Sequence, residues 1–223
     1  MSLSPCPPSR DANPFATCWT RPGALPYLET DRARPDDVVT RLAAAGWRGQ
    51  LVGEHGSGKS ALLQELSRLL NARGVVTVGC KATRGEHSLE SPSGPEAPVG
   101  KVLMVEGFER LTRRERSRLL KHWRELGLGF VVTTHRPLVD WWRPLPVLAA
   151  LRPDERLLRR LFDGLTADRA TPVAWADARR AFARRRGRLR EVWFDLYDLH
   201  ERHTRGERTV AVVVSYTEAR RIG

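Results

Sequence analysis

The sequence predicts an α/β protein with a doubly wound, mostly parallel sheet and a helical C-terminal region. Short apolar runs alternate with helical periodicity between residues 35 and 151, and only helical periodicity follows up to residue 203. A glycine-rich segment, residues 53–60, joins the first apolar run to a leucine-rich helix. In such sheets the ligand crevice lies at the carboxyl ends of the strands. The strand ends expected there are Gly53, Cys80, Glu106 and Thr134.

The first half of the chain supplies two predicted strands and two predicted helices. A helix opens at Pro35 and stops at Gly46, because proline favours a first helical position and glycine a helix end. Residues 49–52 form a buried strand and 61–72 a helix that ends at Gly74. The uncharged run 75–78 is the second strand.

The middle of the chain supplies three more strands. Residues 81–100 lack periodicity and predict a loop before a third strand at 101–106. Thr112 and Glu115 form a capping box that starts a helix to about Leu126. Residues 129–134 and 146–151 are the fourth and fifth strands.

Three helices follow: 154–163 before Gly164, one capped by Thr171, and 188–203. A β-like run at 210–214 has no assigned place.

The amino-acid composition restricts the class of protein less than the pattern of strands and helices does. The net charge of +12 comes mostly from arginine, since only four residues are lysine. It indicates either a polyanionic partner or an arginine-biased composition. Three cysteines without C-x-x-C spacing favour a reducing compartment. Without a signal peptide or a membrane-spanning run, we expect a cytoplasmic protein with no membrane association.

The glycine-rich segment matches G-x-x-x-x-G-K-[ST], a phosphate-binding loop. Main-chain N–H groups and the positive end of the following helix surround a polyphosphate in such loops. Lys59 is expected to reach the β- and γ-phosphates, and the Ser60 hydroxyl to ligate Mg²⁺. The expected nucleotide-binding residues are Gly53, Glu54, His55, Gly56, Ser57, Gly58, Lys59, Ser60 and Ala61.

Two further segments resemble parts of known P-loop ATPases. The apolar strand that ends at Glu106 resembles a Walker B segment, in which an acidic side chain holds Mg²⁺. Hydrolysing members of the additional-strand class typically carry a glutamate next, where this chain has Gly107. Glu109 either replaces that glutamate or is a solvated residue before a helix.

Thr134 resembles a sensor-1 residue, with His135 as a second candidate and a simple turn as the structural alternative. Residues 187–191 resemble the start of a sensor-2 helix, in which Arg190 matches the arginine that reaches the phosphates. Its arginine-rich surroundings equally fit a solvated basic helix face or a nucleic-acid surface.

Residues 14–203 together resemble a compact bacterial AAA+-like ATPase, a P-loop NTPase of the additional-strand class. The resemblance implies Mg-ATP as ligand. It also implies a nucleotide-binding core with an irregular N-terminal arm (14–152) and a helical lid (153–206). The proline- and serine-rich composition of residues 1–13 predicts a disordered tail, and the C-terminal tail (207–223) holds a possible extra strand. Gly107 and the short segment between the second and third strands depart from the family pattern and predict modest hydrolysis.

Three functions fit these observations. The first is an ATPase or ATP-driven switch, with Lys59, Glu106, Glu109, Thr134 and Arg190 as its catalytic residues and Ser60 and Glu106 as metal ligands. The second is an accessory ATPase whose basic lid face binds nucleic acid or a partner protein, and the third is a small-molecule kinase. No guanine-reading N-K-x-D segment is present, but ATP and GTP, like the oligomeric state, stay open.

Overall fold

The computed structural model describes residues 12–21, 24–25, 27–30, 33–82, 101–138 and 144–206. In this part of the chain, five parallel strands form one sheet in the order β2-β3-β4-β1-β5. The strands are β1 (Arg48–Gly53), β2 (Thr77–Lys81), β3 (Val102–Glu106), β4 (Gly129–Thr134) and β5 (Val147–Leu151). The predicted α/β class is therefore confirmed. The central strand β1 pairs with β4 on one side and β5 on the other.

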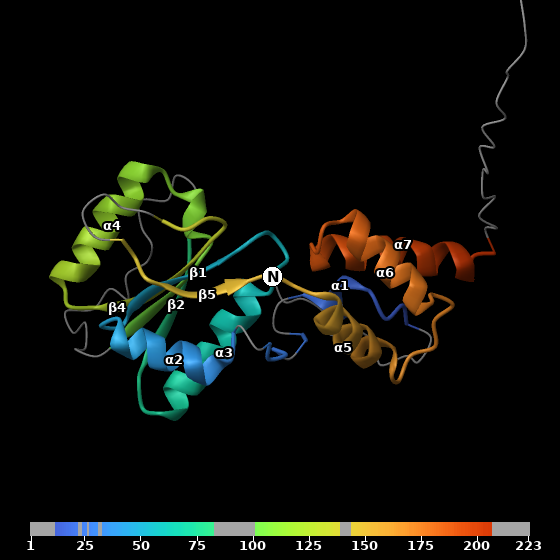
Figure 1. The fold of residues 1–223 in the computed structure, drawn as a ribbon, viewed down its shortest axis with the longest axis horizontal. Helices are drawn as coiled ribbons and strands as arrows, with labels where there is room; N and C mark the ends of the chain where they lie inside the picture. Colours follow the sequence, from blue (N-terminus) through green and yellow to red (C-terminus); the bar gives the residue numbers. More distant parts are fainter. Residues whose placement is uncertain are drawn as a thin grey trace, which may run out of the picture.

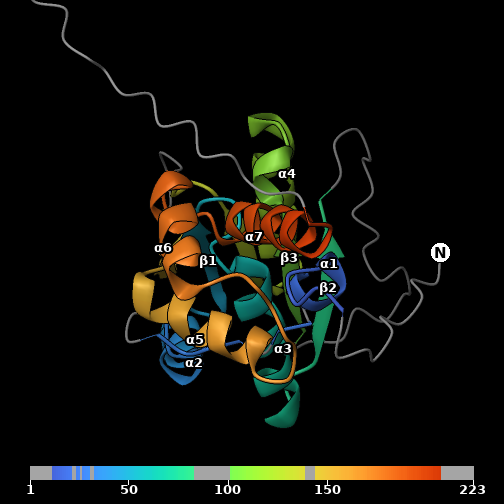
Figure 2. The same ribbon diagram turned by 90° about the vertical axis from the view of Figure 1, so that its right-hand side faces the viewer.

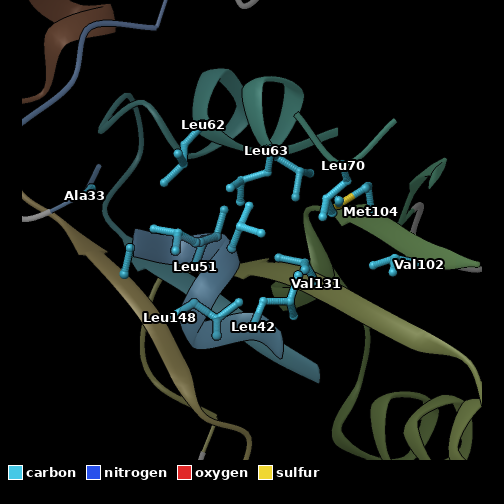
Figure 3. Packing of buried hydrophobic residues seen from close by; sticks show 14 of the residues in the cluster. Ala33, Leu42, Leu51, Leu62, Leu63, Leu70, Val102, Met104, Val131 and Leu148 are labelled. Carbon is cyan, nitrogen blue, oxygen red and sulfur yellow. The ribbon is translucent and has the colours of Figure 1, made fainter. Parts of the chain in front are cut away.

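Helices cover both faces of the sheet (Figure 1). The helices α2 (Pro35–Ala44) and α3 (Lys59–Ala72) lie on one face, and α4 (Arg113–Glu125) lies on the other. Figure 3 shows the leucines of α3 packing toward Leu51 of β1 and Val131 of β4. These residues are buried completely or nearly so, and this burial fixes the start of α3 against the end of β1.

Aromatic rings fill the space between α4 and the sheet. Trp123 of α4 lies 5.8 Å from Phe108 and 5.3 Å from Phe130 of β4, measured between ring centroids. The predicted capping box begins this helix: Glu115 N–H donates to the Thr112 hydroxyl, and Thr112 N–H donates to the Glu115 carboxylate.

The remaining helices form a second hydrophobic cluster beside the sheet. They are α1 (Thr17–Thr20), α5 (Glu155–Thr166), α6 (Trp175–Arg184) and α7 (Leu189–Thr204). We call these helices and the segment 12–28 the helical group. Seen from the side of this group, α5, α6 and α7 lie in front of α3 and the strands (Figure 2).

Phe15 lies at the centre of the helical group. It is 1% exposed, and its ring stacks on Phe162 of α5 and Trp193 of α7 at 5.8 and 6.3 Å. Asn13 Nδ2 donates to the Tyr197 carbonyl and to Glu201 Oε1 of α7. The N-terminal arm therefore packs with the C-terminal helices, whereas the sequence suggested an irregular arm on the sheet domain. It also contains one helical turn, α1.

Several element boundaries differ from the prediction. β2 begins at Thr77 because Val75 N–H donates to Leu70 O and closes the end of α3. Helix α5 continues through Gly164 to Thr166.

Thr171 does not cap α6. The cap residue is Ala174, whose N–H donates to Asp177 Oδ2, while the Thr171 hydroxyl pairs with His200 Nδ1.

Some expectations concern residues outside the described part. The predicted loop beyond Ala82 (83–100) and the β-like run 210–214 lie there. Among the described cysteines, Cys80 is a free thiol and Cys18 is disulfide-bonded. No helix in the described ranges is long and apolar enough to cross a membrane.

Candidate functional site

The glycine-rich loop, residues 53–60, leaves the carboxyl end of β1 and turns directly into α3. Gly56 and Gly58 have φ angles of 72° and 92°, a left-handed conformation that side chains with a Cβ rarely adopt. Gly58 caps α3 without a side-chain acceptor. In the described part of the chain, no acceptor contacts the N–H groups of residues 58–61. These unpaired donors and the helix dipole make this end of α3 suited to an anion.

Lys59 stays inside the loop. Its Nζ donates to the carbonyls of Gly53 and Glu54 at 2.5 and 2.8 Å, and the residue is only 8% exposed. Burial lowers the pKa of Lys59, while the nearby carboxylates of Glu109 and Glu106 act in the opposite direction. The carboxylates of Glu109 and Glu106 lie near the Lys59 ammonium group, but among the described residues it donates only to main-chain carbonyls.

Ser60 and Glu106 meet across the gap between α3 and β3. Ser60 Oγ donates to Glu106 Oε1 at 2.5 Å. A hydroxyl and a carboxylate oxygen are hard donors of the kind that Mg²⁺ prefers. Among the described residues no group of three or more His, Cys, Asp or Glu could hold a metal ion. A cation at this pair would take its remaining ligands from water and from a bound anion.

The residue after Glu106 has to be small. Gly107 has a φ of 76°, and its N–H donates to Thr133 Oγ1 at 2.9 Å. A Cβ at this position would lie 3.2 Å from Arg110 Nε. A glutamate at position 107 would thus be both strained and crowded.

Glu109 lies close by on the 3₁₀ helix η1 (Phe108–Arg110). Its Oε1 is 3.0 Å from His135 Nε2, and its Oε2 is buried without a hydrogen-bond partner. The His135 ring in turn lies against His55 of the loop, with ring centroids 3.9 Å apart. Burial lowers the pKa of His135, although Glu109 raises it. The structural alternative of a fully solvated Glu109 therefore does not hold.

A cavity of about 190 Å³ lies between the loop and the helical group. Its polar end is formed by residues 55–61 together with Glu106, Glu109, Thr133 and His135. Its apolar end is formed by Leu25 and Leu28 of the arm, Leu157 and Leu161 of α5, and Trp193 of α7. Basic side chains also line it: Arg21, Arg110, Arg152 and Arg190. The cavity thus joins a polar surface with main-chain donors to an apolar surface.

The first turn of α7 packs on the loop. A Cβ at Gly56 would lie 2.9 Å from Arg190 N, and Arg188 Nε contacts Glu54 Oε2 at 3.3 Å. Arg190 therefore lies beside the loop, with its main chain against Gly56, and it lines the cavity.

Four residues expected at the site, Gly53, Glu54, Cys80 and Thr134, do not line the cavity. Thr134 is completely buried, and its hydroxyl donates to Gln50 Oε1 at 3.3 Å, because successive strand residues point to opposite faces. Its neighbours Thr133 and His135 line the cavity in its place. Gly53 and Cys80 are not among the lining residues, although Gly53 O binds Lys59.

Sequence reasoning also missed Gln50. This buried side chain of β1 bonds the main chain of Leu138 and Leu145, so it fixes the connection from β4 to β5. A polar residue inside an otherwise apolar strand was the available signal.

The arginines of α6 and its C-terminal turn are largely paired with acidic groups. Arg184 and Arg185 both bind Asp195 of α7, at 2.7 and 2.6 Å. These contacts, above all the hydrogen bond with Arg185, lower the pKa of Asp195 to about 2. Arg179 pairs with Glu155 and Arg180 with Asp177. Much of the charge predicted for a basic face is neutralised inside the helical group.

No protein-family model matches the chain, and no curated protein matches it either.

Proposed function

We propose that this chain is a Mg-ATP-binding P-loop protein, AAA+-like and of the additional-strand class, that hydrolyses ATP slowly. One observation carries the proposal: the unpaired N–H groups of residues 58–61 share a cavity wall with Lys59 and with the Ser60–Glu106 pair. Donors, a cation and a hard-oxygen pair within one turn of helix match what a triphosphate and its Mg²⁺ require.

The sheet order supports the class. β4 lies between the loop strand β1 and the acidic strand β3, which is the arrangement that an additional strand produces. This places the carboxyl end of β4 between the loop and Glu106, where Thr133 and His135 line the cavity. His135 is accordingly the better candidate than Thr134 for sensing the terminal phosphate.

Each charged residue then has a distinct task. Lys59 exchanges the carbonyls of Gly53 and Glu54 for phosphate oxygens, and Ser60 and Glu106 hold Mg²⁺, which neutralises phosphate charge. Glu109 accepts the proton of the attacking water through its unpartnered Oε2, and His135 orients the carboxylate through Oε1. Glu109 lies two positions after residue 107, where hydrolysing members of the class typically carry the glutamate, so we expect turnover to be modest.

We propose that the helical group acts as the lid. Leu157, Leu161 and Trp193 would cover the base of the nucleotide, while Arg190 approaches the phosphates. The contact between Arg188 and Glu54 would hold this lid on the loop.

Titration of the purified protein with ATP and Mg²⁺ tests the proposal. Lys59→Ala should weaken ATP binding by about 10- to 100-fold, because a hydrogen bond to a charged group contributes about 1.5–3 kcal/mol. The matched control is Lys81→Ala, which removes the same charge from the exposed end of β2. Equal affinities of the two variants would exclude the loop as the binding site.

Hydrolysis is tested separately. Glu109→Gln should lower turnover by about 100-fold or more and leave ATP affinity unchanged, since a positioned base contributes about 10²–10⁴-fold. Glu125→Gln, an exposed change on α4, is the control. Full turnover by Glu109→Gln would mean that another group accepts the proton of the attacking water. The proposal that the loop binds ATP would remain.

The two other functions receive less support. The basic lid face is largely compensated by Asp195, Asp177 and Glu155. The kinase alternative rests on residues 136–152, of which 139–143, with Trp141, Trp142 and Arg143, lie outside the described part.

A further inference from the structure

The most basic helix of the described chain is α4, not α6 with its paired arginines. Residues 113–125 hold six Arg or Lys against two Glu. Four of the basic residues are exposed: Arg113, Arg114, Arg118 and Lys121. We call these four residues the α4 face. The buried side of the helix holds Leu120 and Trp123, and by helical spacing Arg114, Arg118 and Lys121 lie on the opposite side.

Within the described residues, no ion pair neutralises Arg113, Arg114 or Arg118 of the α4 face. Lys121 approaches Glu125 at 3.8 Å with side chains 80% and 60% exposed, a contact that contributes little. The arginines 179, 180, 184 and 185, in contrast, all pair with acidic side chains. A concentration of unpaired positive charge creates a field that attracts polyanions.

We propose that the α4 face binds the phosphodiester backbone of a double-stranded nucleic acid. Arg114, Arg118 and Lys121 are spaced i, i+4 and i+7, so they form a row along one side of the helix about 10 Å long. A duplex carries one negative charge per about 1.7 Å of axis, so the row spans several phosphates. This proposal is independent of the proposed ATP site.

Two features favour a duplex over a single strand. Proteins that hold single strands stack bases on exposed aromatic rings. The one tryptophan of α4, Trp123, is buried, and the α4 face offers only flexible basic side chains. Such side chains bind phosphates without reading bases, so the binding should not depend on sequence.

Fluorescence anisotropy with a labelled DNA duplex of about 20 base pairs tests the proposal, over about 50–200 mM salt. Four phosphate contacts predict that log K falls with log salt with a slope of about −3.6. The variant R114A/R118A/K121A should reduce this slope by about 2 to 3 and weaken binding at low salt by at least about tenfold. A thermal melt checks that it folds, and glutamine at the same positions gives a second variant with good helix propensity.

The matched control removes three exposed arginines from the helical group: R156A/R180A/R202A. It should lose less than about threefold in affinity, because those charges lie away from the bound duplex and are screened by salt. An equal loss of duplex affinity in both variants would show that binding depends only on net charge, and it would overturn the proposal. Absence of duplex binding at low salt would overturn it too. Tighter α4-dependent binding to single-stranded DNA, to polyglutamate or to anionic vesicles would assign the face to a different partner.

Discussion

The two walls of the cavity are built in different ways. The sheet wall comes mostly from one contiguous segment, residues 55–61, completed by the ends of β3 and β4. The opposite wall takes Leu25, Leu157 and Trp193 from three segments, the first of which lies more than a hundred residues before the other two. The first wall presents main-chain donors and charges, whereas the second is apolar. The proposed phosphate binding would therefore depend on local geometry, whereas the shape of the pocket depends on tertiary packing.

The largest expected effect is a loss of stability caused by a change behind the apolar wall. Phe15→Ala should destabilise the protein by about 3–5 kcal/mol, because it opens a cavity among Phe162, Trp193 and their neighbours. Chemical denaturation followed by tryptophan fluorescence measures the loss. The control is Phe194→Ala, an exposed ring on α7 that should cost less than about 0.5 kcal/mol. Similar costs for both would mean that the arm does not hold the apolar wall together.

A change beneath the sheet wall should act next most strongly. Gln50→Ala removes the acceptor of Leu138 N–H and a donor to Leu145 O, so buried groups lose their partners and stability falls by about 1–3 kcal/mol. Gln64→Ala on the exposed side of α3 serves as the reference. If the two variants unfold at the same denaturant concentration, Gln50 does not fix the strand connection.

Two glycine variants measure the contact between the walls. Gly56→Ala and Gly74→Ala both place a side chain at positive φ, which costs about 1–2 kcal/mol in each. Only the Cβ at residue 56 meets another element, Arg190 N of α7, and nothing lies within 4 Å at residue 74. Gly56→Ala should therefore lose about 1 kcal/mol more in unfolding free energy. Identical losses would show that α7 does not rest on the loop.

The smallest effect concerns pH within the helical group. Arg185 and Arg184 hold the pKa of Asp195 at about 2, below its unfolded value, so the stabilisation is present above about pH 4 and is lost as pH falls through 2. Asp195→Asn should cost about 1–2 kcal/mol at pH 7, allowing for the partly exposed arginines. The difference from the parent protein should vanish near pH 2. A pH-independent difference would point to packing, and Asp198→Asn is the exposed control.

The sequence predicted the sheet wall far better than the apolar wall. Strand and helix periodicity located every described strand to within three residues, and the loop motif located the start of α3. Thr134 was misplaced because strand alternation does not say which of two adjacent threonines faces the crevice. The arm could not be placed, since nothing local to Asn13 or Phe15 indicates contacts with α7. Charge density left the role of the arginines open, because counting arginines does not reveal which of them meet an aspartate.

Asn13 and Phe15 have a consequence for how the chain matures. Their partners on α7 lie more than 170 residues later, at Trp193, Tyr197 and Glu201. During synthesis the sheet can assemble as soon as β5 emerges, but Asn13 and Phe15 find their partners only after α7 has emerged. The sheet should therefore form as a nascent intermediate with an unfinished helical group, and the emergence of α7, rather than strand pairing, should time completion of that group.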